Sequence, residues 1–226
     1  YFFTTEIEAN RNLIHEGKAQ NMIYFVGHVM IDNLLYQHEK ICKMDDTEFK
    51  VYTLKRETDQ YIFLTLHRPS NVDSEEKLTE IMDAINAISG YTTVFFPVHP
   101  RTKKMIEKYG ITLSEKIKIL DPLGFKESLY LWKDAFCVFT DSGGLQEETT
   151  ALGVPCFTIR KNTERPVTVD IGTNTLVGTS GDAIVQSFLR LKSGIKKTGR
   201  IPDLWDGKSA ERIVDILLKE ITGIKG

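Results

Sequence analysis

The chain has 226 residues, of which 41% are hydrophobic and 27% charged, and its formal net charge is −2 at pH 7. This composition fits a globular protein with one large domain, or with one domain and part of another. So small a charge gives no electrostatic basis for bulk binding to nucleic acid or to a membrane. We expect the three cysteines, Cys42, Cys137 and Cys156, to be reduced thiols of a cytoplasmic protein, because their number is odd and their spacing irregular.

The first 59 residues contain few regular elements. Residues 1–4 and 22–26 have strand composition, and residues 6–16 are predicted to form a helix that Gly17 ends. The apolar segment 29–35 follows. Residues 43–59 are polar and charged, so we expect a linker and the rim of a domain there.

From residue 61 onward, predicted strands and helices alternate. Such alternation implies right-handed crossovers and a parallel sheet covered by helices on both faces, which is an α/β, Rossmann-like fold. The predicted strands are 61–66, 92–98, 117–120, 136–140, 156–159 and 175–178. The predicted helices are 74–89, 101–109, 126–133, 145–152, 182–192 and 210–221, and Ser74 is the expected N-cap of the first.

The most informative segment is 136–153, where a buried strand is followed by a helix. Asp141, Ser142, Gly143 and Gly144 lie between them. Two glycines allow a ligand to approach the backbone closely, and the helix behind them presents unpaired N–H groups and a positive dipole end. This is how a phosphate-binding turn is built. The alternative is that the glycines serve the turn alone, as any doubly wound domain needs tight turns after its strands.

Glu147 and Glu148 follow in the first turn of the predicted helix. Carboxylates so close to a phosphate would repel it unless they contact something else. A ribose diol is a natural partner, because one carboxylate accepts hydrogen bonds from both hydroxyls. The segment therefore predicts a nucleotide, with its pyrophosphate at the helix end and its sugar on a glutamate.

Other polar clusters also follow predicted strands. His67 and Arg68 follow 61–66, and His99 and Arg101 follow 92–98. Residues 160–165 follow 156–159 in the same way. Since ligands bind at the carboxyl ends of parallel strands, these clusters are expected at one edge. His67 is either a hydrogen-bonded structural residue or a group that contacts phosphate and moves a proton.

Several motifs together resemble the C-terminal half of non-hydrolysing UDP-N-acetylglucosamine 2-epimerases. The resemblance covers nearly the whole chain. It rests on Asp-Ser-Gly-Gly-Leu-Gln-Glu-Glu at 141–148, Leu-Gly-Val-Pro at 152–155, Thr-Glu-Arg-Pro at 163–166, Thr-Leu-His-Arg at 65–68, Pro-Val-His-Pro at 97–100 and Asp-Gly-Lys-Ser-Ala-Glu-Arg at 206–212.

The resemblance implies a role for each matching residue. His67 corresponds to a histidine that contacts the phosphates and is implicated in catalysis, and Arg68 and His99 are expected to bind substrate beside it. The expected diphosphate ligands are Ser142, Gly143, Gly144 and Arg165, and Glu148 is the expected ribose ligand. Glu147 is expected to be a structural partner. An ion pair between Glu164 and Arg165 is an equally good reading of that segment.

The resemblance further implies a two-domain GT-B-type enzyme that converts UDP-N-acetylglucosamine to UDP-N-acetylmannosamine through elimination and re-addition of UDP. Residues 1–55 would be the tail of the N-terminal domain with the crossover, and residues 56–226 the UDP-binding domain. The acid and base carboxylates belong largely to the missing N-terminal domain, so we expect this chain to be inactive alone. A homodimer of the full-length protein is expected, with no metal and no cofactor. A hydrolysing epimerase, a GT-B glycosyltransferase and a non-catalytic nucleotide-binding module remain alternatives.

Overall fold

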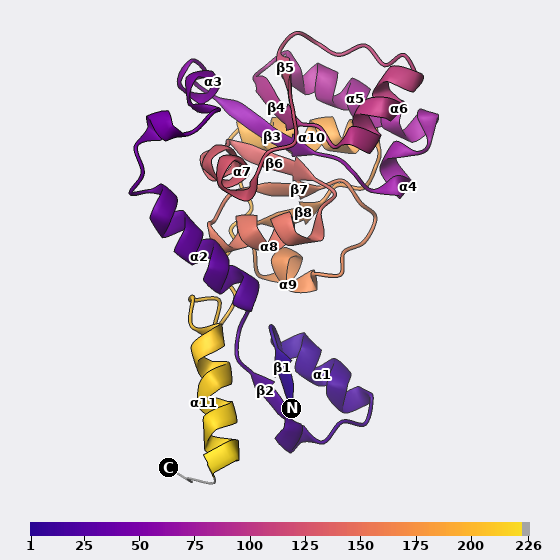
Figure 1. Ribbon diagram of the computed structural model, residues 1–226. Coiled ribbons are helices and arrows are strands. Elements are labelled where there is room, and N and C mark those ends of the chain that lie inside the picture. The colour runs from indigo at the N-terminus through magenta and orange to yellow at the C-terminus, as the bar shows by residue number, and fades with distance from the viewer. Residues whose placement is uncertain (223–226) are drawn as a thin grey trace. The chain divides into compact units, whose positions relative to one another are not determined.

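The computed structural model describes residues 1–222 (Figure 1). Contacts group the chain into two compact units: Tyr1–Lys43 with the segment from Ile201 onward, and Met44–Arg200. The predicted division into domains of a longer protein, residues 1–55 and 56–226, stays a prediction. Among the described residues, no helix combines the length and apolar character needed to cross a membrane.

The smaller unit begins with two parallel strands joined by a helix; the sequence predicts both strands and the helix, and the structure adds their parallel pairing. Its elements are β1 (Phe2–Thr4), α1 (Ile7–His15), the single-turn helix η1 (Gln20–Met22), β2 (Ile23–Phe25), α2 (Val29–Ile41) and α11 (Ser209–Thr222). Asp32 in the first turn of α2 accepts a hydrogen bond from the backbone N–H of Ala210 at 2.7 Å. Arg212 of α11 donates to the carbonyl of Val26 at 3.1 Å. These contacts connect the two ends of the chain within this unit.

The larger unit contains a six-stranded, fully parallel sheet with the order β5-β4-β3-β6-β7-β8 (Figure 1). Its strands are β3 (Tyr61–Thr65), β4 (Thr93–Pro97), β5 (Ile117–Leu120), β6 (Cys137–Thr140), β7 (Cys156–Thr158) and β8 (Asn174–Leu176). The chain runs outward from β3 to β5, returns to β6 beside β3, and continues outward to β8. This is the doubly wound order of a Rossmann-like domain, and it confirms the predicted fold class.

Helices cover both faces of this sheet. The helices of the larger unit are η2 (Asp46–Glu48), α3 (Tyr52–Arg56), α4 (Pro69–Val72), α5 (Glu75–Ser89), α6 (Pro100–Lys108), α7 (Phe125–Trp132), α8 (Gly143–Ala151), α9 (Pro166–Asp170) and α10 (Gly181–Lys192). Helices α5 and α10 lie together on one face, and α7 and α8 lie on the other (Figure 1). The hydroxyl of Ser74 caps α5 by accepting from the N–H of Lys77 at 3.4 Å, which confirms the predicted N-cap.

The main core lies between the sheet and α5 and α10. Alternate residues of β3, Ile62 and Leu64, face it, and Phe188 of α10 packs there. Phe63 lies between these two residues in β3 and points to the opposite face of the sheet. It is also fully buried, because α7 covers that face. Burial on both faces explains why the predicted strands read as continuous apolar runs. The buried face of α5 is Leu78, Ile81, Met82, Ala84, Ile85 and Ile88.

Residues 43–59 are expected to form a linker and the rim of a domain; the structure corrects the linker, because from Met44 onward the segment belongs to the larger unit, and agrees with the rim. The ring of Phe49 stacks on Tyr130 of α7 with centroids 3.9 Å apart. Lys55 of α3 donates to the carbonyl of Tyr130 at 2.8 Å and pairs with Asp134 at 2.5 Å. The segment is therefore packed as part of the larger unit. Among its solvated charges it carries an apolar side chain, Phe49, and a charged one with a partner, Lys55, and these two side chains make the contacts.

Candidate functional site

The strand order reverses between β3 and β6, and the candidate site is built where these two strands end. The hydroxyls of Thr65 and Thr140, which are paired in the sheet register, lie 2.7 Å apart. The backbone N–H of Ser142 donates to the Thr140 hydroxyl at 2.9 Å. In doubly wound sheets, ligands bind in the crevice at such a switch point. Both His67 and Ser142 follow the strands that form it.

Asp141 connects the two strand ends. Its side chain is fully buried, and its carboxylate accepts from the backbone N–H of His67 at 3.1 Å, from that of Arg68 at 2.9 Å and from the side-chain amide of Asn71 at 3.2 Å. Asp141 and Asn71 were not predicted as site residues. The available signal was an acidic residue directly after a buried strand, where its charge needs several donors.

His67 lies against Asp141, with its Nδ1 3.0 Å from Oδ1 of the carboxylate. The hydrogen bond to Asp141 raises the pKa of His67 above its ordinary value, while partial burial and the charge of Arg68 oppose the shift. The ring of His99, the N-cap of α6, is 6.2 Å from that of His67 between centroids. The structure thus brings the two predicted histidines together.

Helix α8 begins at Gly143, two residues earlier than predicted, so both glycines lie in its first turn. Neither has a left-handed backbone, and a Cβ built on Gly144 meets no atom within 4 Å. A Cβ on Gly143 meets only the guanidinium of Arg68, at 4.0 Å. The fold itself therefore does not require glycine at either position, which argues against the reading that they serve the turn alone. Because glycine has no side chain, the space in front of the N–H groups at the start of α8 stays open.

The two glutamates of α8 have different surroundings. Glu147 is buried and its Oε1 lies 2.8 Å from Nε of Arg165, so its expected role as a structural partner is confirmed. Glu148 is half-buried, and burial together with the negative charge of Glu147 raises its pKa from 4.5 to about 7. A half-buried carboxyl at this edge is suited to accept hydrogen bonds from a pair of hydroxyls.

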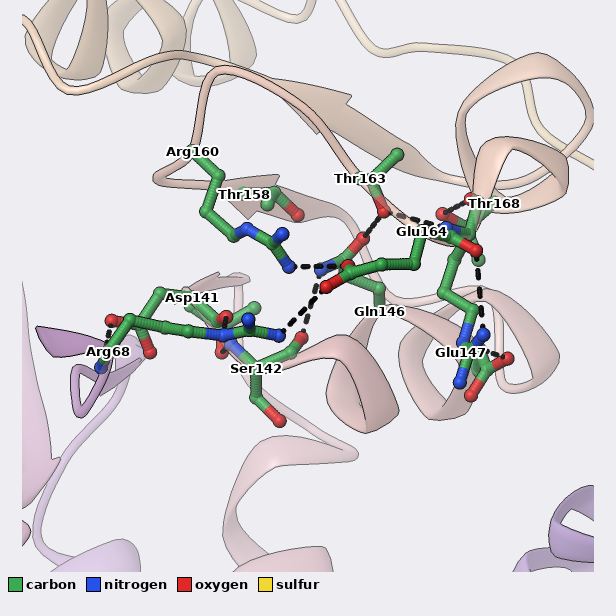
Figure 2. A network of polar contacts seen from close by, with 12 residues as sticks. Arg68, Asp141, Ser142, Gln146, Glu147, Thr158, Arg160, Thr163, Glu164 and Thr168 are labelled. Atoms are coloured by element: carbon green, nitrogen blue, oxygen red, sulfur yellow. Dashed lines mark hydrogen bonds and ion pairs between the residues drawn. The ribbon is translucent and has the colours of Figure 1, made fainter. Parts of the chain in front are cut away.

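Glu164 lies between two arginines (Figure 2). Its carboxylate is 2.7 Å from Arg160 and 3.2 Å from Arg68. The suggested Glu164–Arg165 side-chain pair is wrong, because the guanidinium of Arg165 pairs with Glu147 instead and reaches the backbone carbonyl of Glu164, at 3.4 Å, rather than its carboxylate. Arg160 was not predicted as a site residue. It lies only four residues before Glu164 in the same loop, whereas the contact of Glu164 with Arg68 joins two loops that are 96 residues apart in the chain.

A buried network fixes the loop after β7 to the start of α8 (Figure 2). The amide of Gln146 donates to the carbonyl of Ser142 at 3.0 Å. Its oxygen accepts from Thr163 at 2.6 Å and from Asn174 at 3.1 Å. Because Gln146 is fully buried, its amide depends on these protein groups for its hydrogen bonds. The network therefore holds the loop that carries Glu164 and Arg165 beside the helix end.

The arrangement combines groups for three chemical tasks. The first turn of α8 with Arg68 can bind an anion, Glu148 can bind a diol, and His67 can donate or accept a proton. Phe125, which starts α7 after β5, is exposed at the same edge of the sheet. Within residues 1–222, no group of three or more His, Cys, Asp or Glu side chains is placed to hold a metal ion.

Known proteins share this architecture. The family model for UDP-N-acetylglucosamine 2-epimerase matches residues 1–218. A UDP-N-acetylglucosamine 2-epimerase from Methanocaldococcus jannaschii is 40% identical over 222 residues, which are 96% of this chain and 60% of that protein. A UDP-2,3-diacetamido-2,3-dideoxy-D-glucuronate 2-epimerase from Pseudomonas aeruginosa is 38% identical over 92% of this chain and 56% of its own length.

A solved structure of the M. jannaschii UDP-GlcNAc 2-epimerase in complex with UDP-GlcNAc and UDP superposes with a TM-score of 0.83 and 37% identity, and the match covers 96% of this chain and 60% of that one. The chain thus spans about 60% of the length of the UDP-N-acetylglucosamine 2-epimerases that it matches. The match extends over almost the whole of this chain and confirms the resemblance to UDP-N-acetylglucosamine 2-epimerases that the motifs indicate. This chain belongs to the UDP-N-acetylglucosamine 2-epimerase family.

Proposed function

We propose that this chain is the UDP-binding part of a non-hydrolysing UDP-N-acetylglucosamine 2-epimerase. The proposed reaction inverts C2 of the sugar. Elimination removes the C2 proton and breaks the C1–O bond to UDP, which gives UDP and 2-acetamidoglucal. Re-addition of UDP at C1 with protonation of C2 on the other face gives UDP-N-acetylmannosamine. Such a site must stabilise a leaving diphosphate and hold both fragments.

The open space at Gly143 and Gly144 is the observation that carries this proposal. Glycine at these positions is required neither by a left-handed backbone nor by a close protein atom. It leaves the N–H groups of the first turn of α8 accessible, where the helix dipole favours negative charge. The diphosphate of UDP fits this position, and the hydroxyl of Ser142, which does not cap the helix, is available beside it.

The other predicted residues complete the proposed site. Arg68 lies beside Gly143 and would add a second cationic contact to the diphosphate. Glu148 would bind the ribose hydroxyls. His67 would contact the phosphate and transfer a proton, and His99 would bind the substrate beside it. Arg165 is paired with Glu147 without ligand, so it would have to reorient to reach the diphosphate.

Several properties of the whole protein are proposals that depend on this one. They are an N-terminal domain carrying the acid and base carboxylates, a homodimer, and a cytoplasmic location, which the free thiols of Cys42, Cys137 and Cys156 support. The sugar also needs a test, because the P. aeruginosa relative is named for a different UDP-linked sugar.

The reaction is tested with the full-length protein and UDP-N-acetylglucosamine in deuterated water, followed by NMR. We expect deuterium at C2 and no net loss of nucleotide sugar. Accumulation of UDP and free N-acetylmannosamine would instead establish a hydrolysing epimerase, and no exchange at C2 would contradict both. His67→Asn should abolish the exchange, whereas His15→Asn, at an exposed position of the smaller unit, should leave it unchanged.

A further inference from the structure

The two histidines of the site differ in what contacts their Nδ1 atoms. His67 follows β3 and His99 follows β4, and these strands are neighbours in the sheet. Their rings lie close enough, at 6.2 Å between centroids, to act on one ligand. The charged and titratable groups beside His67 are Asp141 at the end of β6, Arg68 in its own loop and His99. The Nδ1 atom of one histidine contacts a hydrogen-bond acceptor, and the Nδ1 atom of the other contacts a donor.

Nδ1 of His67 faces an acceptor. Oδ1 of Asp141 lies 3.0 Å away, and this buried carboxylate already receives the backbone N–H groups of His67 and Arg68 and the amide of Asn71. A carboxylate surrounded by donors has no proton to give. Nδ1 of His67 must therefore carry the hydrogen. In the neutral ring, the lone pair is then left on Nε2.

Nδ1 of His99 faces a donor. The backbone N–H of Arg101 points to it at 3.2 Å, in the N-cap position of α6. An N–H group can only donate, so Nδ1 of His99 must carry the lone pair. The neutral ring of His99 then has its hydrogen on Nε2.

We propose that Asp141 is a positioning residue that holds neutral His67 as the Nδ1–H tautomer, so that Nε2 of His67 is a proton acceptor while Nε2 of His99 is a donor at the same edge. Their use in catalysis rests on the proposed function, but the tautomers themselves do not. In the proposed reaction the lone pair on Nε2 of His67 would accept a proton that the substrate gives up, and Asp141 would stabilise the resulting cation. Nε2–H of His99 would donate to a phosphate oxygen without changing its protonation.

The raised pKa of His67 agrees with this arrangement, because the Asp141 carboxylate stabilises the cationic ring. The result is a histidine that changes protonation above the ordinary value of about 6.5. His28 offers a further comparison within the chain, since its Nδ1 also accepts a backbone N–H, that of Met30, at 3.2 Å.

Long-range ¹H–¹⁵N NMR of the ligand-free chain, labelled in its histidines, tests the proposal directly. At a pH high enough to deprotonate the rings, we expect Nδ1 of His67 to have the shift of a protonated nitrogen and Nε2 that of an unprotonated one. His99 and His28 should show the reverse pattern. A His67 spectrum with the proton on Nε2 would overturn the proposal. Because no nucleotide is present, failure of UDP to bind the chain would count against the proposed function and not against the tautomers.

Asp141→Asn gives the matched test. The amide oxygen should turn to the N–H groups of Arg68 and Asn71, which places the amide N–H₂ against His67 and converts it to the Nε2–H tautomer. The pKa of His67 should also fall. Glu164→Gln removes a carboxylate from the same edge and should change neither property. If Asp141→Asn folds and His67 keeps its hydrogen on Nδ1, the positioning role is disproved; if the variant does not fold, the wild-type spectrum decides.

Discussion

Nε of Arg165 lies 2.8 Å from Oε1 of Glu147, a carboxylate whose side chain is only 7% exposed. The pair joins the loop after β7 to the first turns of α8. A buried carboxylate depends on its partner far more than an exposed one, because an unpaired charge cannot regain its hydration. Arg165 is thus part of the fold as well as a proposed diphosphate ligand.

Arg165→Ala should therefore lower the free energy of unfolding by about 1 to 3 kcal/mol, because Glu147 loses its charged hydrogen-bond partner. Urea denaturation of the chain measures the change. The double variant with Glu147→Gln should recover much of the loss, since the neutral amide tolerates burial better. If Arg165→Ala is as stable as the wild type, the ion pair is not structural.

Glu164 provides the opposite case. It contacts both Arg160 and Arg68, yet half of its side chain is exposed. Arg160, chiefly through its hydrogen bond, lowers the pKa of Glu164 to about 2. The group therefore contributes stability above its ordinary pKa, and the contribution is lost as pH falls toward 2. Solvent screening keeps that contribution small, so Glu164→Gln should cost less than about 1 kcal/mol at neutral pH. A loss as large as that of Arg165→Ala in the same urea titration would contradict this ranking.

Glu148 gives a prediction for pH dependence. Burial and the charge of Glu147 raise its pKa from 4.5 to about 7, so the folded state binds a proton that the unfolded state has released between these values. The free energy of unfolding should fall as pH rises through this window. Glu148→Gln should lack that part of the dependence and be more stable than the wild type at pH 8. Equal pH profiles for the two proteins would show that the carboxyl is not desolvated.

UDP should also change the protonation of Glu148. A carboxylate that accepts from both ribose hydroxyls must be ionised, so binding should release a proton when the titration is done near pH 6.5. Calorimetry in buffers of different ionisation enthalpy measures this release. Glu148→Gln should remove it and weaken binding. An unchanged release in the variant would assign the proton to another group.

The sequence predicts most of the sheet because its signals are local. The central strands β3, β4 and β6 are short, largely apolar runs, and α5 has both an N-cap and a helical period. The short helices α4 and α9 were missed, because four or five residues carry no period, although Pro69 and Pro166 stand at their first positions. Proline there indicates a helix start only when a helix is already expected.

The candidate site could be predicted only in part. The motifs place His67, Ser142 and Glu148 at strand ends, and the sheet order then brings those ends together. The partners of the charged groups are long-range and could not be read from spacing. Asp141 contacts a loop more than 70 residues earlier in the chain, and Glu164 pairs with Arg68, 96 residues away.

Calorimetric titration of UDP into the chain and its Gly144→Ala variant tests the central claim most directly. The methyl group meets no protein atom, so the variant should fold at least as stably as the wild type. It should bind UDP tenfold or more weakly, a loss of about 1.4 kcal/mol or more, because the methyl group occupies the diphosphate's place. Gly90→Ala, at the end of α5 where φ is −59°, is the control and should bind like the wild type. If Gly144→Ala binds UDP as tightly as the wild type, the diphosphate does not lie on the start of α8; if the wild type does not bind, the same titration on full-length protein decides, and a second failure would contradict the nucleotide site.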